Sequence, residues 1–280
     1  MKKCTQGQSG FTLIEAIMVM TITAILAASV AVFLRKPIDG YMDLARRTEL
    51  SDIADTAVRR ISRDLHLALP NSVRVVPADT GCLEFIPTAN GGRYRADVDG
   101  LGAGNVFTTA AALTMFDVLG PLNVATVAGD RIVVFNLGIP GADAYAGDNI
   151  STVTAGSTTL INITAKQFPF TSPGSRFHVI SGTEQSVFYA CTGVGTAGGN
   201  GTGTLFRLNR AITATVPVAC PTIPANTPIL AQNLSVCQFD YVSGATGATE
   251  RDGIVSMRLG ITKNNETVNL YHEVHVNNVP

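Results

Sequence analysis

The residues of this sequence whose spacing most resembles a chemical motif are glycines. Residues 193–198 read Gly-Val-Gly-Thr-Ala-Gly, a spacing that binds dinucleotide phosphates when a helix N-terminus follows it. Here the chain continues through more glycines at 199–203 into another apolar, strand-like run. We therefore predict a glycine-rich hairpin loop at this position and no phosphate-binding cradle.

The histidines suggest metal binding or acid–base chemistry, but their placement argues against both. His272 and His275 flank Glu273 in a run with strand-like alternation, and positions three apart in a strand point to opposite faces. His66 belongs to a helical pattern and His178 to another strand-like run, and neither has a suitable serine or cysteine nucleophile beside it in the sequence. The sequence predicts no catalytic residues, no metal site and no cofactor.

The cysteines are better explained by structure than by reactivity. Cys82, Cys191, Cys220 and Cys237 lie beyond residue 80, while Cys4 lies near the N-terminus. None forms a Cys-x-x-Cys pair or has a histidine at zinc-ligand spacing. Four thiols in an oxidising compartment usually form two disulfides, with three possible pairings. Cys191 with Cys237 is favoured because both lie in strand-like runs.

The overall composition excludes one large class of partner. The chain has 280 residues, 46% of them apolar, which is enough for a buried core in one or two domains. Its formal net charge is -1 and only 15% of its residues are charged. Because no basic face is available to bind phosphates, nucleic acid is not expected as a partner.

An apolar segment near the N-terminus is the strongest single feature of the sequence. Residues 16–34 carry no charge, and at 1.5 Å per residue they span about 28 Å, close to the thickness of a bilayer core. Lys2 and Lys3 precede the segment, so the N-terminus is expected in the cytoplasm and the rest outside. The alternative is a cleaved signal peptide, because residues 27–31 are small; Glu15 argues against it, since a carboxylate is costly in an apolar helix.

The sequence GFTLIE at residues 10–15 resembles the processing site of type IV prepilins and type II secretion pseudopilins. The resemblance implies that a prepilin peptidase removes residues 1–10 by cutting after Gly10, and that the new N-terminal Phe11 is N-methylated. It also implies that Glu15 pairs with the terminal amine of a neighbouring subunit. Such pairing is physically favourable because an unpaired carboxylate in lipid is energetically costly. Glu15 reaching the cytoplasmic headgroups is the alternative.

Taken over its whole length, the sequence predicts an α+β, pilin-like fold: a long N-terminal helix packed on an antiparallel β-sheet. We expect a transmembrane half at 11–34 and an amphipathic half at 35–70, with a stripe at Ile53, Ala57, Ile61, Leu65 and Leu69 and an end at Pro70. The region 71–280 is expected to be a β-rich domain with strands at 82–87, 130–138, 158–165, 176–181, 186–191 and 204–212 and a C-terminal hairpin of 253–262 with 266–276. Residues 98–128 are interpreted as an insertion with one short helix at 110–118.

Softer similarities narrow the resemblance. Residues 40–75, 87–97, 230–241 and 271–280 are similar to the family of the O component of mannose-sensitive haemagglutinin (MSHA) pilus biogenesis, whose C-terminal half is also similar to J-type minor pseudopilins of type II secretion. This implies a minor pilin that helps to initiate or cap a filament, with the major pilin, other minor pilins, prepilin peptidase and the bacterial inner membrane as partners. The domain would lie in the periplasm and then in the filament or at its tip, on the cell surface. A J-like minor pseudopilin and a pilus-tip adhesin are the alternatives.

Overall fold

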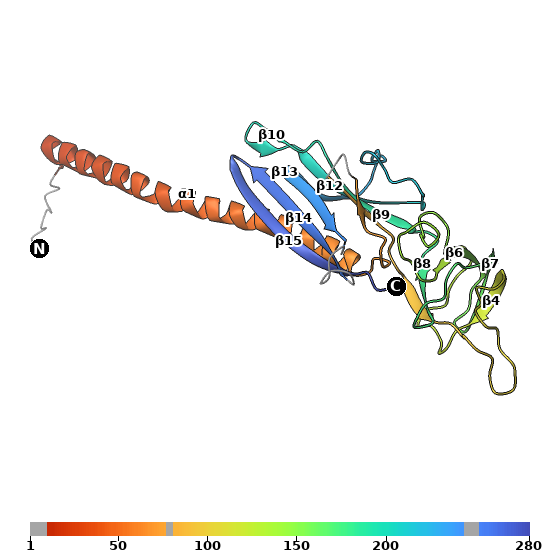
Figure 1. Ribbon diagram of the computed structural model, residues 1–280. Helices are drawn as coiled ribbons and strands as arrows, with labels where there is room; N and C mark the ends of the chain where they lie inside the picture. Colours follow the sequence, from red (N-terminus) through yellow and green to blue (C-terminus); the bar gives the residue numbers. More distant parts are fainter. Residues whose placement is uncertain (1–9, 77–80, 244–251) are drawn as a thin grey trace, which may run out of the picture. The chain divides into compact units, whose positions relative to one another are not determined.

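The computed structural model describes residues 10–76, 81–243 and 252–280 (Figure 1). By its internal contacts the chain separates into one unit that ends at Glu49 and a larger one from Leu50 to Pro280. A single long helix, α1 (Leu13–Leu65), contributes residues to both units. The prediction of a long N-terminal helix with antiparallel β-sheets is confirmed.

Both ends of α1 have local causes. Thr12 caps the N-terminus, because the backbone N–H of Glu15 donates to the Thr12 Oγ1 atom at 3.4 Å. The helix ends at Leu65, short of the expected end at Pro70. Beyond it the backbone N–H of Ala68 bonds the Leu65 carbonyl, three residues back, and the N–H of Leu69 bonds the carbonyl of Ile86. The chain leaves the helix early because its backbone groups find partners in the β-structure.

The larger sheet has seven strands within the described residues, all antiparallel, in the order β1-β2-β9-β12-β13-β14-β15. Figure 1 labels β9, β12, β13, β14 and β15 of this sheet. Their bounds are β1 Arg74–Val75, β2 Cys82–Phe85, β9 Ser186–Thr192, β12 Gly203–Arg210, β13 Ile229–Val242, β14 Asp252–Lys263 and β15 Glu266–Asn277. The predicted C-terminal hairpin is β14 with β15, and its turn residues Asn264 and Asn265 both have positive φ angles.

The last turns of α1 supply the apolar face that covers this sheet. Leu50, Ala57, Ile61 and Leu65 are at most 1% exposed and belong to one hydrophobic cluster with residues of β2, β9, β12, β13, β14 and β15. Of the predicted stripe, only Ile53 remains partly exposed. Deleting a buried side chain of this kind typically costs about 2–5 kcal/mol, so this docking is a major source of the domain's stability.

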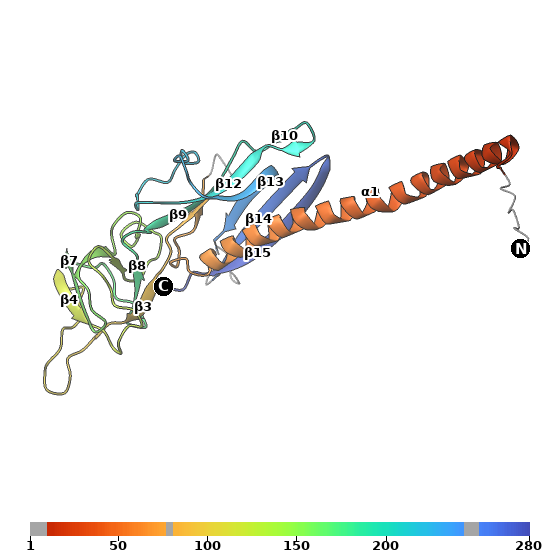
Figure 2. The same cartoon turned by 180° about the vertical axis from the view of Figure 1, so that it is seen from behind.

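The second sheet has six strands in the order β3-β8-β5-β6-β7-β4. Their bounds are β3 Asn90–Arg93, β4 Leu113–Asp117, β5 Arg131–Val133, β6 Ile150–Ala155, β7 Leu160–Lys166 and β8 Arg176–Ile180; Figure 2 shows β3 beside β8 from behind. Tyr94, just after β3, forms an antiparallel bridge with Val118, just after β4. The two outer strands therefore meet, and the sheet closes on itself into a barrel.

The barrel corrects one prediction. Residues 110–118 were expected to form a short helix, but they contain strand β4, which pairs antiparallel with β7. Phe116 is fully buried in a cluster with the aromatic rings of Tyr94, Phe107, Phe168 and Phe177. The Ala, Leu and Met residues of this segment favour a helix, but intrinsic preferences are weak and tertiary strand pairing often overrides them.

In chain order, the barrel lies between two neighbouring strands of the larger sheet. β2 and β9 are antiparallel partners, with Cys82 opposite Ala190, yet strands β3 to β8 separate them in the sequence. Leu69 and Ile86 from beside the larger sheet pack with Val133 and Ile180 of the barrel strands in one buried cluster. The barrel is thus an insertion into the seven-stranded sheet, fixed to it by a shared hydrophobic cluster.

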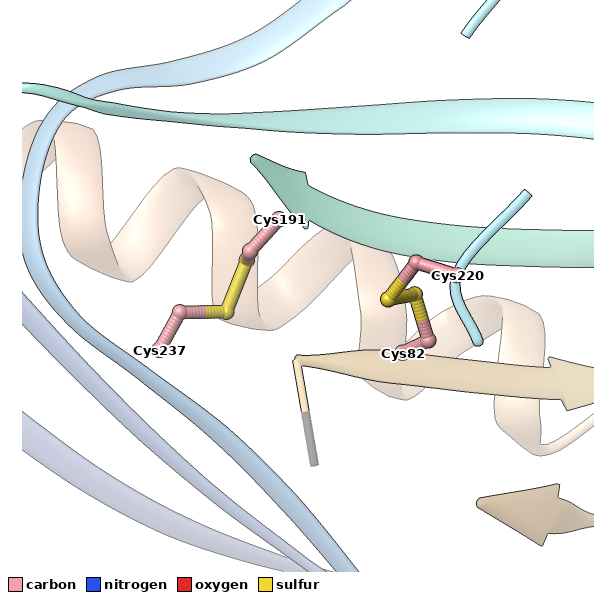
Figure 3. Close-up of a disulfide and its surroundings, with 4 residues drawn as sticks. All are labelled: Cys82, Cys191, Cys220 and Cys237. Carbon is pink, nitrogen blue, oxygen red and sulfur yellow. A yellow bond between two sulfur atoms is a disulfide. The ribbon is translucent and has the colours of Figure 1, made fainter. Parts of the chain in front are cut away.

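Two disulfides brace the larger sheet (Figure 3). Cys191 of β9 is joined to Cys237 of β13, the pair favoured by the sequence, with 6.4 Å between their Cα atoms. Cys82 of β2 is joined to Cys220 with 5.7 Å between Cα atoms. Cys220 lies in the 211–228 connection between β12 and β13, so this bond ties that connection to the buried strand β2.

Candidate functional site

The candidate site is the N-terminal segment around Gly10, Phe11 and Glu15. Gly10 and Phe11 precede α1 and have no regular secondary structure, and the Phe11 side chain is 81% exposed. A Cβ atom added at Gly10 would meet nothing within 4 Å. The Gly10–Phe11 peptide bond is therefore non-helical and open, which is the form of backbone that a protease must bind. The residues of the expected leader before Gly10 lie outside the described part of the chain.

Glu15 lies in the first turn of α1, where the helix dipole favours a negative charge. Its side chain is exposed, and among the described residues it has no ion-pair partner. A carboxylate beside an apolar segment is stabilised when a cation meets it. The arrangement leaves this charge available to a group from another molecule.

The apolar stretch that follows Glu15 has the properties of a membrane span. It has a mean hydropathy of 2.5 and none of it is buried within the protein, so by length and composition α1 can cross a membrane. The hydroxyl groups in it are internally satisfied: Thr21, Thr23 and Ser29 donate to the carbonyls of Met18, Val19 and Ile25 at 2.7–2.9 Å. Large side chains such as Phe33, 78% exposed, remain open to a surrounding apolar phase.

The other sequence candidates do not come together into a site. The glycine-rich segment connects β9 to β12 and contains a small ladder of β10 (Thr196–Ala197) with β11 (Asn200–Gly201), so it is the hairpin connection that was predicted. His272 and His275 lie on opposite faces of β15, as their spacing indicates. In the ranges that the structure describes, no three histidine, cysteine, aspartate or glutamate side chains are grouped to hold a metal ion.

A buried carboxylate in the larger sheet was not predicted from the sequence. Glu84 of β2 is buried and accepts hydrogen bonds from Arg74 Nε at 2.6 Å, Arg210 Nη2 at 3.0 Å and Ser186 Oγ at 2.5 Å. The Arg74 guanidinium also lies 3.6 Å over the ring of Tyr145, whose pKa is raised well above its ordinary value by burial and then by the Glu84 charge. All of these hydrogen bonds to Glu84 come from other strands of the sheet, so the group functions as a cross-strand clamp.

A second polar cluster ties the end of α1 to the sheet. The Asp64 carboxylate accepts from the Tyr189 hydroxyl and from Arg207 Nε, both at 2.7 Å. Burial and then the hydrogen bond to Asp64 raise the pKa of Tyr189, because both disfavour its charged form. Arg207 also contacts Glu184 at 2.7 Å. The sequence does not show which charged residues of different strands will meet, because their contacts depend on how the strands pair.

Comparison with known families bears on the N-terminal segment. Residues 5–31 match the prokaryotic N-terminal methylation motif. The chain therefore carries the signal of type IV pilin-like proteins, and the match contains Gly10, Phe11, Glu15 and most of the apolar stretch. No curated protein and no solved structure matches the chain.

Proposed function

We propose that this protein is a minor pilin of a type IV pilus of the MSHA type, a structural subunit that helps to initiate or cap the filament. The observation that carries the proposal is the methylation motif at residues 5–31, together with the apolar first part of α1, none of which is buried within the described protein. The motif is typical of structural rather than catalytic proteins. The assignment to the MSHA type rests on the similarities at residues 40–75, 87–97, 230–241 and 271–280.

Processing is the first step of the proposed function. A prepilin peptidase cuts after Gly10 on the cytoplasmic side, and Phe11 becomes the methylated N-terminus. The non-helical backbone at Gly10 supports this step, as does the open space around the position of an added Cβ atom among the described residues. Cutting before the helix leaves the anchor on the product, so the mature chain waits in the inner membrane with its β-domain in the periplasm.

Assembly is the second step. The exposed apolar face of the helix, from Leu13 to Leu34, buries itself against the helices of other minor pilins and the major pilin. Glu15 pairs with the Phe11 amine of a neighbour, and this pairing fixes the axial offset because an unpaired carboxylate in lipid is costly. The subunit then leaves the membrane for the filament, at or near its tip.

The test of processing is the N-terminal mass of the full chain purified from cells with and without prepilin peptidase. We expect a start at methylated Phe11 only when the peptidase is present. Gly10→Val should block cleavage, and Gly100→Val is the matched control, because a Cβ at either glycine meets nothing within 4 Å. A start near residue 30, or processing that does not depend on the peptidase, would contradict the proposal.

The assembly step needs its own measurement. We expect Glu15→Gln to be processed normally but to lower the yield of pili sheared from cells. Loss of enzyme export with pili intact would instead assign the chain to a type II secretion system as a J-like minor pseudopilin. Normal piliation without adhesion, after deletion of the whole protein, would make it a tip adhesin.

A further inference from the structure

The outer strand β15 leaves an unusually long free edge on the seven-stranded sheet. It pairs with β14 at all twelve positions from Glu266 to Asn277 with no register shift. In the part of the chain that the structure describes, no strand pairs with its other edge. Proteins usually protect such an edge with a proline, a bulge or a very short strand, and β15 has none of these. The opposite outer strand, β1, is protected because it has only two residues.

The hairpin turn determines which backbone groups lie on that free edge. Asn264 and Asn265 form a two-residue turn with φ angles of 53° and 64°, so the closing pair Lys263 and Glu266 is hydrogen-bonded. Hydrogen-bonded pairs then alternate along the ladder. The residues whose N–H and C=O groups point away from β14 are therefore Thr267, Asn269, Tyr271, Glu273, His275 and Asn277.

A groove with a volume of about 730 Å³ runs between this edge and α1. It is lined by Asp55, Arg59 and Arg63 of the helix, by His66 just after it, and by Leu270 and His272 of the strand, among others. Leu270 points toward the core yet remains half-buried, so its apolar surface is incompletely covered. A strand added beside β15 would place every second side chain over this groove.

The charges of the groove select the side chains that fit it. Arg59 contacts Asp55 at 2.5 Å, whereas Arg63 has no carboxylate partner among the described residues. Two guanidinium groups thus face the groove against one carboxylate. Acidic side chains on an incoming strand would complement them, and basic side chains would be repelled.

A second copy of this chain is a poor occupant. Its opposite edge, β1, is too short to match β15. If it used its own β15, it would bring a second Arg59 and Arg63 toward the same groove. We propose that the edge of β15 binds an extended segment of a different protein, which adds to the sheet as a further strand and directs acidic side chains at alternate positions toward Arg59 and Arg63.

The binding test uses the purified full chain in detergent and a fluorescent peptide of about ten residues that alternates threonine and glutamate. We expect it to bind at least about tenfold more tightly than the same peptide with lysine in place of glutamate. N-methylation of the amides that face β15 should abolish binding, while N-methylation of the alternate amides should not. Equal binding of the glutamate and lysine peptides, or binding unaffected by either N-methyl series, would overturn the proposal.

Two variants test the edge from the side of the protein. Asn269→Pro removes an outward N–H without removing a bond to β14, and Asn269→Ala keeps that N–H. We expect the proline variant to bind the glutamate peptide about tenfold more weakly than the alanine variant, with the same thermal unfolding curve. Arg59→Glu with Arg63→Glu should also weaken binding, and Arg176→Glu, at an exposed residue of the barrel strand β8, should not. If Asn269→Pro fails to fold, the two N-methylated peptide series still test whether the peptide binds as a strand beside β15.

A photocrosslinker at Tyr271, which is 64% exposed, identifies the occupant in cells. An adduct with an acidic, extended segment of another protein supports the proposal, and an adduct only with a second copy overturns it. These variants leave residues 10–15 unchanged, so processing at Gly10 can be measured in the same samples. A failure at the β15 edge is thereby distinguished from a failure of the proposed function.

Discussion

Glu84→Gln removes a buried negative charge on which two guanidinium groups converge. The Glu84 side chain is 1% exposed, and its partners Arg74 and Arg210 are only 14% and 27% exposed. Breaking a buried ion pair by removing one partner typically costs about 3–5 kcal/mol, because the remaining charge stays buried without compensation. Glutamine keeps the shape and one acceptor oxygen, so we expect a loss of about 3 kcal/mol, at the lower end of that range.

A matched control is available in the loop just before strand β9 of the same sheet. Glu184 also contacts an arginine, Arg207, but its side chain is 37% exposed. Glu184→Gln should therefore cost less than about 1 kcal/mol, as exposed ion pairs do. The pair of variants changes the same functional group in the same way and differs mainly in burial.

The assay is urea unfolding of the full chain in detergent, followed by far-UV circular dichroism. At an ordinary dependence on urea, a loss of about 3 kcal/mol lowers the midpoint by about 1 M or more. The reasoning is refuted if Glu84→Gln lowers the midpoint no more than Glu184→Gln does. That result would mean that solvent compensates the two arginines when the carboxylate is gone.

Two further predictions concern the disulfides and one histidine. Replacing Cys82 and Cys220 with serine should lower the free energy of unfolding by roughly 2–5 kcal/mol, because this bond closes the longer of the two loops; urea unfolding of the double variant checks it, and an unchanged midpoint would contradict it. Burial and then the charge of Arg176 lower the pKa of His178, so the folded state binds fewer protons than the unfolded one and stability should fall as pH drops below about 6.5. His178→Gln should reduce this loss, measured as the difference in thermal midpoint between neutral and mildly acidic buffer.

Much of the fold was predictable because local spacing encodes it. The uncharged run at 16–34 and the four-residue spacing of Ala57, Ile61 and Leu65 predicted one long helix, and the alternation after residue 70 predicted strands. The asparagines at 264 and 265 predicted the hairpin turn that the structure contains. These features depend on residues that are near one another in the chain, so no knowledge of the partners was needed.

The candidate site was also readable from the sequence, whereas the contacts within the β-domain were not. Gly10, Phe11 and Glu15 lie within six consecutive residues, and their spacing alone carries the motif. Closure of the barrel joins Tyr94 to Val118, a contact that depends on the register of all six strands. The same dependence explains why β4 was mistaken for a helix.

The sequence by itself determined the membrane-length helix, the methylation motif and the presence of strands, because each is a local pattern of residue types. Only the tertiary structure decided that Glu84 is buried among arginines, that Cys82 pairs with Cys220, and that β15 has a free edge beside a basic groove. Each of these joins residues far apart in the chain. Such a contact forms, and contributes to stability, only when strand order and register bring both partners together. A short stretch of neighbouring residues therefore cannot predict it.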